Sequence, residues 1–139
     1  MLRLILAAPL LLATACTPTF NWREIAVGPA PLHAMFPCKP DKAENSTQFP
    51  GRVIVLHATG CETGGAAFVV VYGDRGDDAD PRTMLSQWEQ VTLAAAKAKG
   101  TQAQAKYFAR GRMVYQAVVY APKLKAEMTE PFFAGLRFE

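Results

Sequence analysis

The sequence contains few serines, and it has no long hydrophobic run. Its 139 residues include only two serines, Ser46 and Ser86, and neither lies in the G-x-S-x-G turn of a serine hydrolase. The longest uncharged apolar run, residues 4–13, is shorter than the roughly 20 residues that cross a bilayer as a helix, and Pro9 interrupts it. The sequence therefore supports neither a serine hydrolase nor a permanent membrane-spanning helix.

The first fifteen residues have the pattern of a secretory signal peptide. The α-amino group and Arg3 form a short positive segment, the apolar run follows, and small residues come next. The end of this segment, Ala13-Thr14-Ala15, is an A-x-A site at which an ordinary signal peptidase could cut. We expect residues 1–15 to be removed on export and to take no part in the fold.

The residues that run into Cys16 resemble the lipobox of bacterial lipoproteins, although Ala13 stands where leucine is usual and Leu12 is adjacent. The resemblance implies that the Cys16 thiol receives a diacylglycerol group, that the chain is cut before Cys16 and that the new amino group is acylated. Because Thr17 rather than an aspartate follows, it also implies an outer-membrane lipoprotein that faces the periplasm, with residues 16–19 as a short tether. The alternative is a soluble periplasmic protein.

The number of cysteines agrees with lipidation of Cys16. An exported chain with three cysteines has one left over after a disulfide forms. If Cys16 carries lipid, Cys38 and Cys61 remain as one pair in an oxidising compartment, where disulfides persist. We therefore predict a Cys38–Cys61 disulfide.

Two histidines offer an alternative use of the same cysteines. His33 precedes Cys38 by five positions and His57 precedes Cys61 by four, so the four side chains could form a tetrahedral zinc or copper(I) site. The alternative function is therefore a metal-handling or thiol-active protein that uses His33, Cys38, His57 and Cys61. The spacing matches no standard zinc finger, and we expect no cofactor, no metal and no catalytic residues.

The charge of the chain is unevenly distributed, although its formal net charge is only +3. Residues 90–126 contain no aspartate or glutamate, and a basic face is one reading of the lysines and arginines in that segment. Such a face could contact anionic headgroups or an envelope protein, whereas nucleic acid is not an expected partner outside the cytoplasm. The other reading is that these side chains are solvated on separate elements. The residues concerned are Lys97, Lys99, Lys106, Arg110, Arg112, Lys123 and Lys125.

The pattern of apolar residues predicts strands joined by tight turns, with two helices inserted. The strongest strand signals are "RVIVLHAT" and "AAFVVVY", which are rich in β-branched residues and apolar on both faces. Asp80 is a natural N-cap for a helix that closes at Gly100, and Thr129 could cap a second, short helix. Residues 102–121 suggest a second hairpin that turns at Arg110-Gly111.

These elements make a single α+β domain over residues 20–139. We expect an antiparallel β-sheet of two hairpins plus terminal strands, with one main helix and a short C-terminal helix packed on one face. The segments "FNWRE", "FPCKP", "GCETGG", "RMVYQAVVY" and "FFAGLRF" resemble a group of small proteobacterial exported lipoproteins of unknown function. More distantly, "FPCKP" and the terminal aromatic helix with its strand resemble the PsbP-like fold, which implies a protein-binding or assembly module without inherited catalytic residues.

Overall fold

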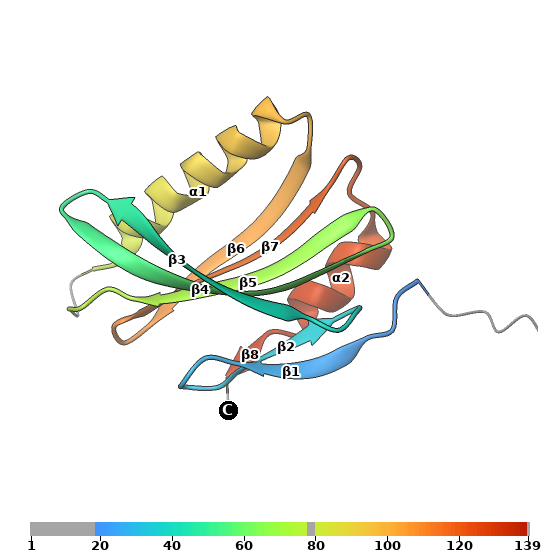
Figure 1. The fold of residues 1–139 in the computed structure, drawn as a ribbon, viewed down its shortest axis with the longest axis horizontal. Helices are drawn as coiled ribbons and strands as arrows, with labels where there is room; N and C mark the ends of the chain where they lie inside the picture. The colour runs from blue at the N-terminus through green and yellow to red at the C-terminus, as the bar shows by residue number, and fades with distance from the viewer. Residues whose placement is uncertain (1–18, 78–79, 139) are drawn as a thin grey trace, which may run out of the picture.

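A computed structural model of the chain describes residues 19–77 and 80–138. The expected signal peptide, and Cys16 with most of the expected tether, lie outside these residues. In chain order the elements are β1 (Arg23–Val27), β2 (Leu32–Phe36), β3 (Asp41–Phe49), β4 (Arg52–Thr63), β5 (Ala66–Asp74), α1 (Arg82–Ala98), β6 (Gln102–Arg110), β7 (Met113–Ala121), α2 (Ala126–Ala134) and β8 (Arg137–Phe138) (Figure 1).

Five strands form one antiparallel sheet in the order β3-β4-β5-β7-β6. The two strongest strand signals become its neighbouring strands β4 and β5, because β-branched side chains suit a sheet that is buried on both faces. The turn between them is tight: β4 continues to Thr63, so only Gly64 and Gly65 connect it to β5. Both glycines have a positive φ, which is characteristic of a tight hairpin turn. The predicted hairpin of residues 102–121 is confirmed as β6 and β7.

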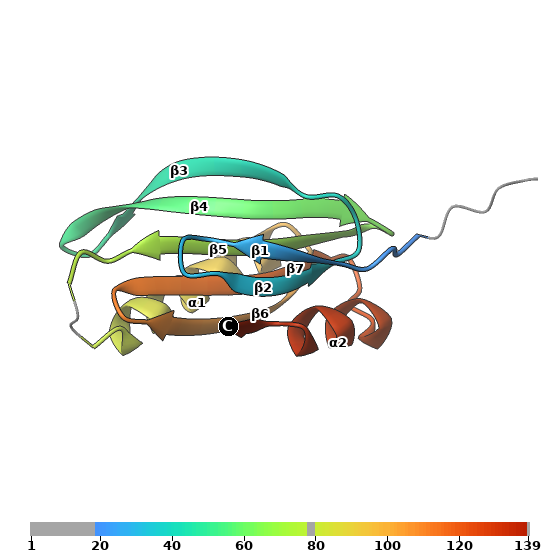
Figure 2. The same cartoon turned by 90° about the horizontal axis from the view of Figure 1, so that it is seen from below.

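The first two strands and the last one form a separate three-stranded sheet in the order β1-β2-β8. Together with α2 it covers the front face of the five-stranded sheet, the face seen in Figure 2. Phe36 of β2, Phe68 of β5 and Phe132 of α2 are fully buried there. The ring centroid of Phe132 lies 5.8 Å from that of Phe36 and 5.7 Å from that of Phe68. This aromatic core joins the two sheets through the short helix.

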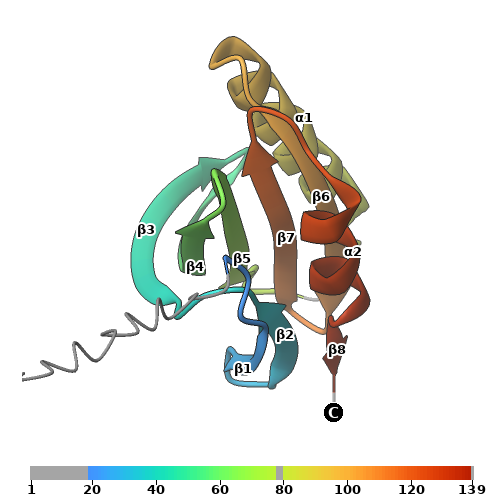
Figure 3. The same cartoon turned by 90° about the vertical axis from the view of Figure 1, so that its right-hand side faces the viewer.

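The long helix α1 covers the opposite, back face of the five-stranded sheet (Figure 3). Trp88 points from α1 onto the sheet, with its ring centroid 6.0 Å from that of Phe49 and 5.6 Å from that of Tyr107. A buried polar contact adds to this packing, because the Gln116 side-chain amide donates to the Thr92 hydroxyl at 2.9 Å and to the Tyr107 hydroxyl at 2.6 Å. The helix is thus attached to β6 and β7 by both apolar and polar contacts.

The α+β class, with antiparallel strands, one main helix and one short C-terminal helix, is confirmed. The arrangement differs in two details, because the terminal strands form their own sheet and the helices lie on opposite faces rather than on one. The reason is that strands β5 and β7 are apolar on both sides, so a single layer of helices would leave one side exposed to water.

The ends of the helices show which capping predictions hold. The Asp80 carboxylate accepts a hydrogen bond from the Arg82 main-chain N–H at 3.0 Å, and Gly100 follows α1 with a φ of +67°. α1 begins at Arg82, so Pro81 rather than Asp80 is its N-cap residue, one position later than predicted, while Gly100 closes the helix as expected. The predicted Thr129 cap is wrong, because α2 begins at Ala126 after the extended Lys125 and Thr129 lies buried inside the helix.

Candidate functional site

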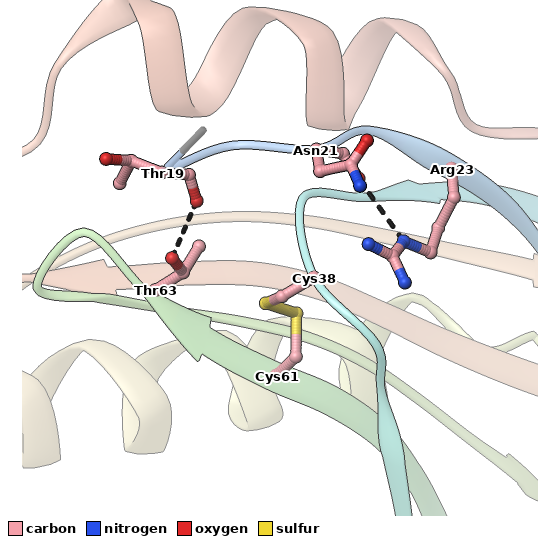
Figure 4. The surroundings of a disulfide bond; sticks show 6 residues. All are labelled: Thr19, Asn21, Arg23, Cys38, Cys61 and Thr63. Atoms are coloured by element: carbon pink, nitrogen blue, oxygen red, sulfur yellow. Dashed lines mark hydrogen bonds between the residues drawn. A yellow bond between two sulfur atoms is a disulfide. The ribbon is translucent and has the colours of Figure 1, made fainter. Parts of the chain in front are cut away.

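The predicted disulfide is present and connects the two sheets. Cys38 follows β2, Cys61 lies in β4, and their Cα atoms are 6.0 Å apart across 23 positions of sequence (Figure 4). Nearby, the Asn21 main-chain N–H donates to the Pro37 oxygen at 2.8 Å. The Thr63 hydroxyl donates to the Thr19 main-chain oxygen at 2.7 Å. The start of the described chain is therefore fixed against the same end of the five-stranded sheet as the disulfide.

The structure does not bring the alternative metal ligands into one site. Cys38 and Cys61 are bonded to each other, so neither sulfur is a thiolate ligand. His33 faces Glu24, with 3.4 Å between its Nδ1 and the carboxylate, and His57 faces a different acid, Glu44, at 3.5 Å. Within residues 19–77 and 80–138, no group of three or more histidine, cysteine, aspartate or glutamate side chains is arranged to hold a metal ion.

A groove on the front face is the clearest candidate for a binding site, and the sequence analysis did not predict it. Its walls come from β1 and β3, and its volume is about 290 Å³. The His57 imidazole stacks on the Tyr72 ring inside it, with centroids 4.8 Å apart and planes inclined by 15°. The residues that line it are Ala26, Val27, Gly28, Lys42, Ala43, Glu44, His57, Ala58, Thr59 and Tyr72.

The register of β3, β4 and β5 explains why these side chains meet. Glu44 pairs with His57 across β3 and β4, and His57 pairs with Tyr72 across β4 and β5. Residues that face each other across antiparallel strands lie on the same side of the sheet, so a carboxylate, an imidazole and a phenol follow one another across the groove. The alternation of each strand was visible in the sequence, but the register that aligns the three residues was not.

The groove combines charged, aromatic and apolar side chains. Its described lining includes a cation, Lys42, an anion, Glu44, and an aromatic surface, but neither serine nor cysteine. The His57–Glu44 pair in the groove is half exposed. Beyond the groove the same face carries two exposed valines, Val53 at 62% and Val55 at 41% of their accessible surface. We find no catalytic constellation among the described residues.

The basic residues of segment 90–126 divide between the two ends of the sheet instead of forming one face. Arg110 and Arg112 flank the β6–β7 turn, where Arg112 pairs with Asp74 at 2.6 Å and the Arg110 guanidinium lies 4.6 Å from the centre of the Phe138 ring. The Arg112 contact lowers the pKa of Asp74, with help from the Gly76 main-chain N–H. Lys106 lies between the ends on β6.

The other four lysines lie at the opposite end. Lys97 and Lys99 end α1 and lead into β6, while Lys123 and Lys125 follow β7 and lead into α2. Gln102 at the start of β6 pairs with Ala121 at the end of β7, so both lysine pairs flank the same end of the sheet. The seven basic residues therefore lie in two separate regions, with Lys106 between them, and do not share one face.

No protein-family model, curated protein or solved structure matches this chain. The resemblance to small exported lipoproteins and to the PsbP-like fold stays a prediction. None of the helices described here is both long and apolar enough to cross a membrane. What the protein does must therefore be argued from its own residues.

Proposed function

We propose that this protein is an exported module of the cell envelope, held at the periplasm-facing side of the outer membrane by lipid on Cys16, and that it acts by binding a partner rather than by catalysis. The Cys38–Cys61 disulfide is the observation that carries this proposal. Disulfides persist in oxidising compartments, and this one leaves Cys16 as the one other cysteine in the sequence. The signal-peptide pattern before Cys16 supports the same conclusion.

The physical basis of attachment is burial of acyl chains. Each buried methylene contributes about 0.8 kcal/mol, so that one chain gives marginal attachment and two or three hold a protein firmly. A lipidated Cys16 would carry enough chains for stable anchoring without any transmembrane helix.

Replacement of Cys16 tests the anchor. We expect Cys16→Ala to be exported and to leave the membrane fraction, and we expect the mature wild-type N-terminal peptide to carry the mass of the acyl chains. The matched control is the double variant Cys38→Ala with Cys61→Ala, which removes two cysteines and should remain with the membrane. A Cys16→Ala protein that stays with the membrane after a high-salt wash would refute the anchor.

The groove and the exposed valines beside it support a binding role for the front face of β3 and β4. β1 borders this part of the sheet at the groove, and the surface there offers apolar, aromatic and charged groups together. Such a mixture, an apolar surface with a few convergent polar groups, is typical of recognition sites. We propose that an envelope protein contacts this face.

Photo-crosslinking from two exposed valines tests the binding face. A crosslinking residue at Val53 lies on the front face of β4, whereas one at Val91, with 69% of its surface exposed, lies on α1 on the other side. We expect a discrete adduct from Val53 in whole cells, lost when His57→Ala and Tyr72→Ala alter the groove. Equal adducts from both positions, or none from Val53, would contradict this assignment.

A further inference from the structure

The end of the domain at which the described chain begins is also the end that carries four lysines. We call it the tether end and define it by Thr19, the Gly64-Gly65 turn and those lysines. Thr19 contacts Thr63 directly, and a Cβ atom added at Gly64 would lie 3.0 Å from the Thr19 side chain. In Figure 1 the β4–β5 turn, the start of α2 and the start of β1 lie at the right of the molecule, and the end of α1 lies above them, right of centre. The lysines are Lys97, Lys99, Lys123 and Lys125.

A shallow hollow connects these segments directly. It is bordered by Thr63 and Gly65 from the turn beside Thr19, by Thr101, and by Pro122. Thr101 follows Lys99 by two positions and Pro122 precedes Lys123. The Leu124 main-chain N–H also donates to the Gln102 side chain at 2.7 Å, which holds the two lysine-bearing connections together. Residues far apart in the sequence thus meet at one end.

The four lysines are exposed, and none of them forms an ion pair with a residue in the described ranges. Two glutamates, Glu62 and Glu127, lie at the same end and are also exposed, while Lys39 and Asp41 beside the disulfide offset each other. Two positive charges remain in excess. Unpaired lysines on a solvated surface are available to an external anion.

Three arginines at the far end of the domain are, in contrast, paired with aspartates. Arg52 pairs with Asp77 at 2.9 Å, Arg82 pairs with Asp80 at 2.6 Å and Arg112 pairs with Asp74 at 2.6 Å. Asp74, Asp77 and Asp80 are therefore already matched by cations of the same chain. The four lysines without an ion pair therefore lie at the tether end, whereas the three paired arginines lie at the other end.

We propose that the tether end docks on anionic lipid headgroups of the membrane that holds the Cys16 lipid. This inference rests on the proposed anchoring. Only three residue steps separate Cys16 from Thr19, and three extended residues span at most roughly 11 Å. A tether of that length keeps Thr19 within about 11 Å of the lipidated residue, a distance comparable to the Debye length of roughly 8 Å at physiological ionic strength. The lysines then meet the negative surface potential while the groove remains open on the side of the sheet.

Vesicle binding by the Cys16→Ala protein measures the docking without any contribution from acyl chains. We expect it to sediment with vesicles of phosphatidylglycerol and phosphatidylcholine in equal parts, to bind less well at high salt, and not to bind vesicles of phosphatidylcholine alone. Each lysine near an anionic surface strengthens binding by about fivefold, so Lys99→Gln with Lys123→Gln should weaken it by about 25-fold.

The matched control removes the same charge elsewhere. Arg82→Gln with Lys106→Gln takes two exposed positive charges from outside the tether end and should change binding by less than about threefold. Equal losses in both double variants, or equal binding to both kinds of vesicle, would overturn the proposal.

A second measurement uses the lipidated wild-type protein in the same two kinds of vesicle. Acetylation of Lys123 and Lys125 should be slower in the anionic vesicles, whereas acetylation of Lys106 should be unchanged. Equal rates at all three positions would overturn the docking even where the acyl chains are present. The mass of the N-terminal peptide reports the lipid independently, so a chain without lipid refutes the anchor and a lipidated chain with unprotected lysines refutes only the docking.

Discussion

The Thr63 hydroxyl donates a hydrogen bond of 2.7 Å to the main-chain oxygen of Thr19, across 44 positions of sequence. This contact fixes the start of the described chain against the β4–β5 turn. It places Thr19 near the disulfide and at the same end of the sheet as four lysines without an ion pair in the described ranges. The proposals on anchoring and docking both depend on that placement.

The two glycines of the β4–β5 turn allow the packing of this segment to be measured. Gly64→Ala and Gly65→Ala each force alanine into the left-handed region, at φ values of +61° and +76°, at a cost of roughly 1–2 kcal/mol. Only at Gly64 would the new Cβ meet the Phe20 and Thr19 side chains, both at 3.0 Å, whereas nothing lies within 4 Å at Gly65. We expect Gly64→Ala to lower the free energy of unfolding by about 1 kcal/mol more than Gly65→Ala in urea denaturation. Equal losses would mean that residues 19–20 do not pack on the turn in solution.

The disulfide should contribute measurably to stability. Cross-linking residues 23 positions apart lowers the entropy of the unfolded chain and stabilises the fold by about 3 kcal/mol in the chain-entropy treatment. We expect Cys38→Ser with Cys61→Ser to lower the melting temperature without preventing secretion. Reductant should lower the wild-type melting temperature by a similar amount and leave the double variant unchanged. If the wild-type protein were insensitive to reductant, the bond would not be formed in solution.

The buried Gln116 amide should be coupled energetically to helix α1. Gln116→Leu keeps the volume but removes the donor to the Thr92 and Tyr107 hydroxyls, and we expect a loss of about 1–3 kcal/mol in the free energy of unfolding. The double variant Gln116→Leu with Thr92→Val should lose less free energy of unfolding than the two single variants added together, because either change alone already removes the hydrogen bond between them. Gln104→Leu, an exposed change on β6, serves as the control. Strict additivity of the two buried changes would show that this contact does not attach the helix.

Three tyrosines should make the fold sensitive to alkali. Burial raises the pKa of Tyr107, Tyr115 and Tyr120 above the ordinary value of 10.0, because tyrosinate is poorly solvated inside the protein. The unfolded chain then loses its phenolic protons before the folded chain does. The stability from this source is fully present below about pH 10 and is lost as the pH rises through the folded pKa values.

Tyrosinate absorbance and urea unfolding, measured over the same alkaline range, test this expectation. We expect the free energy of unfolding to fall steadily as the pH rises above about 10, and Tyr107→Phe to make that fall shallower. Complete titration of every tyrosine near pH 10 in the folded protein would contradict the predicted burial.

Several elements could be predicted from the sequence because their signals are local. The β-branched runs of β4 and β5, the Asp80 and Gly100 signals at the ends of α1, and the hairpin at Arg110-Gly111 depend on residues within one turn or one strand. The Thr129 cap failed because a threonine that suits an N-cap can equally well be buried inside a helix, and only packing against the core decides between them.

The candidate sites were predictable only in part. The disulfide could be inferred from the number of cysteines and the expected compartment, without any knowledge of the fold. The groove could not, because Lys42, Glu44, His57 and Tyr72 meet through the register of three strands, and a shift by one residue would move them to the other face. The sequence left two readings of the basic residues open, because charge along a sequence does not say at which end of a sheet each lysine lies.

The sequence by itself determined the class of fold, the strands with the strongest signals, the ends of the long helix to within one position and the pairing of the two cysteines. These follow from short-range backbone preferences, from periodic burial and from simple counting of thiols. The tertiary structure alone decided that the helices cover opposite faces, that His57 stacks on Tyr72, and that Thr19 shares one end of the sheet with Lys99 and Lys123. Such relationships join residues dozens of positions apart, and strand register and layer packing set them only after the whole chain has folded.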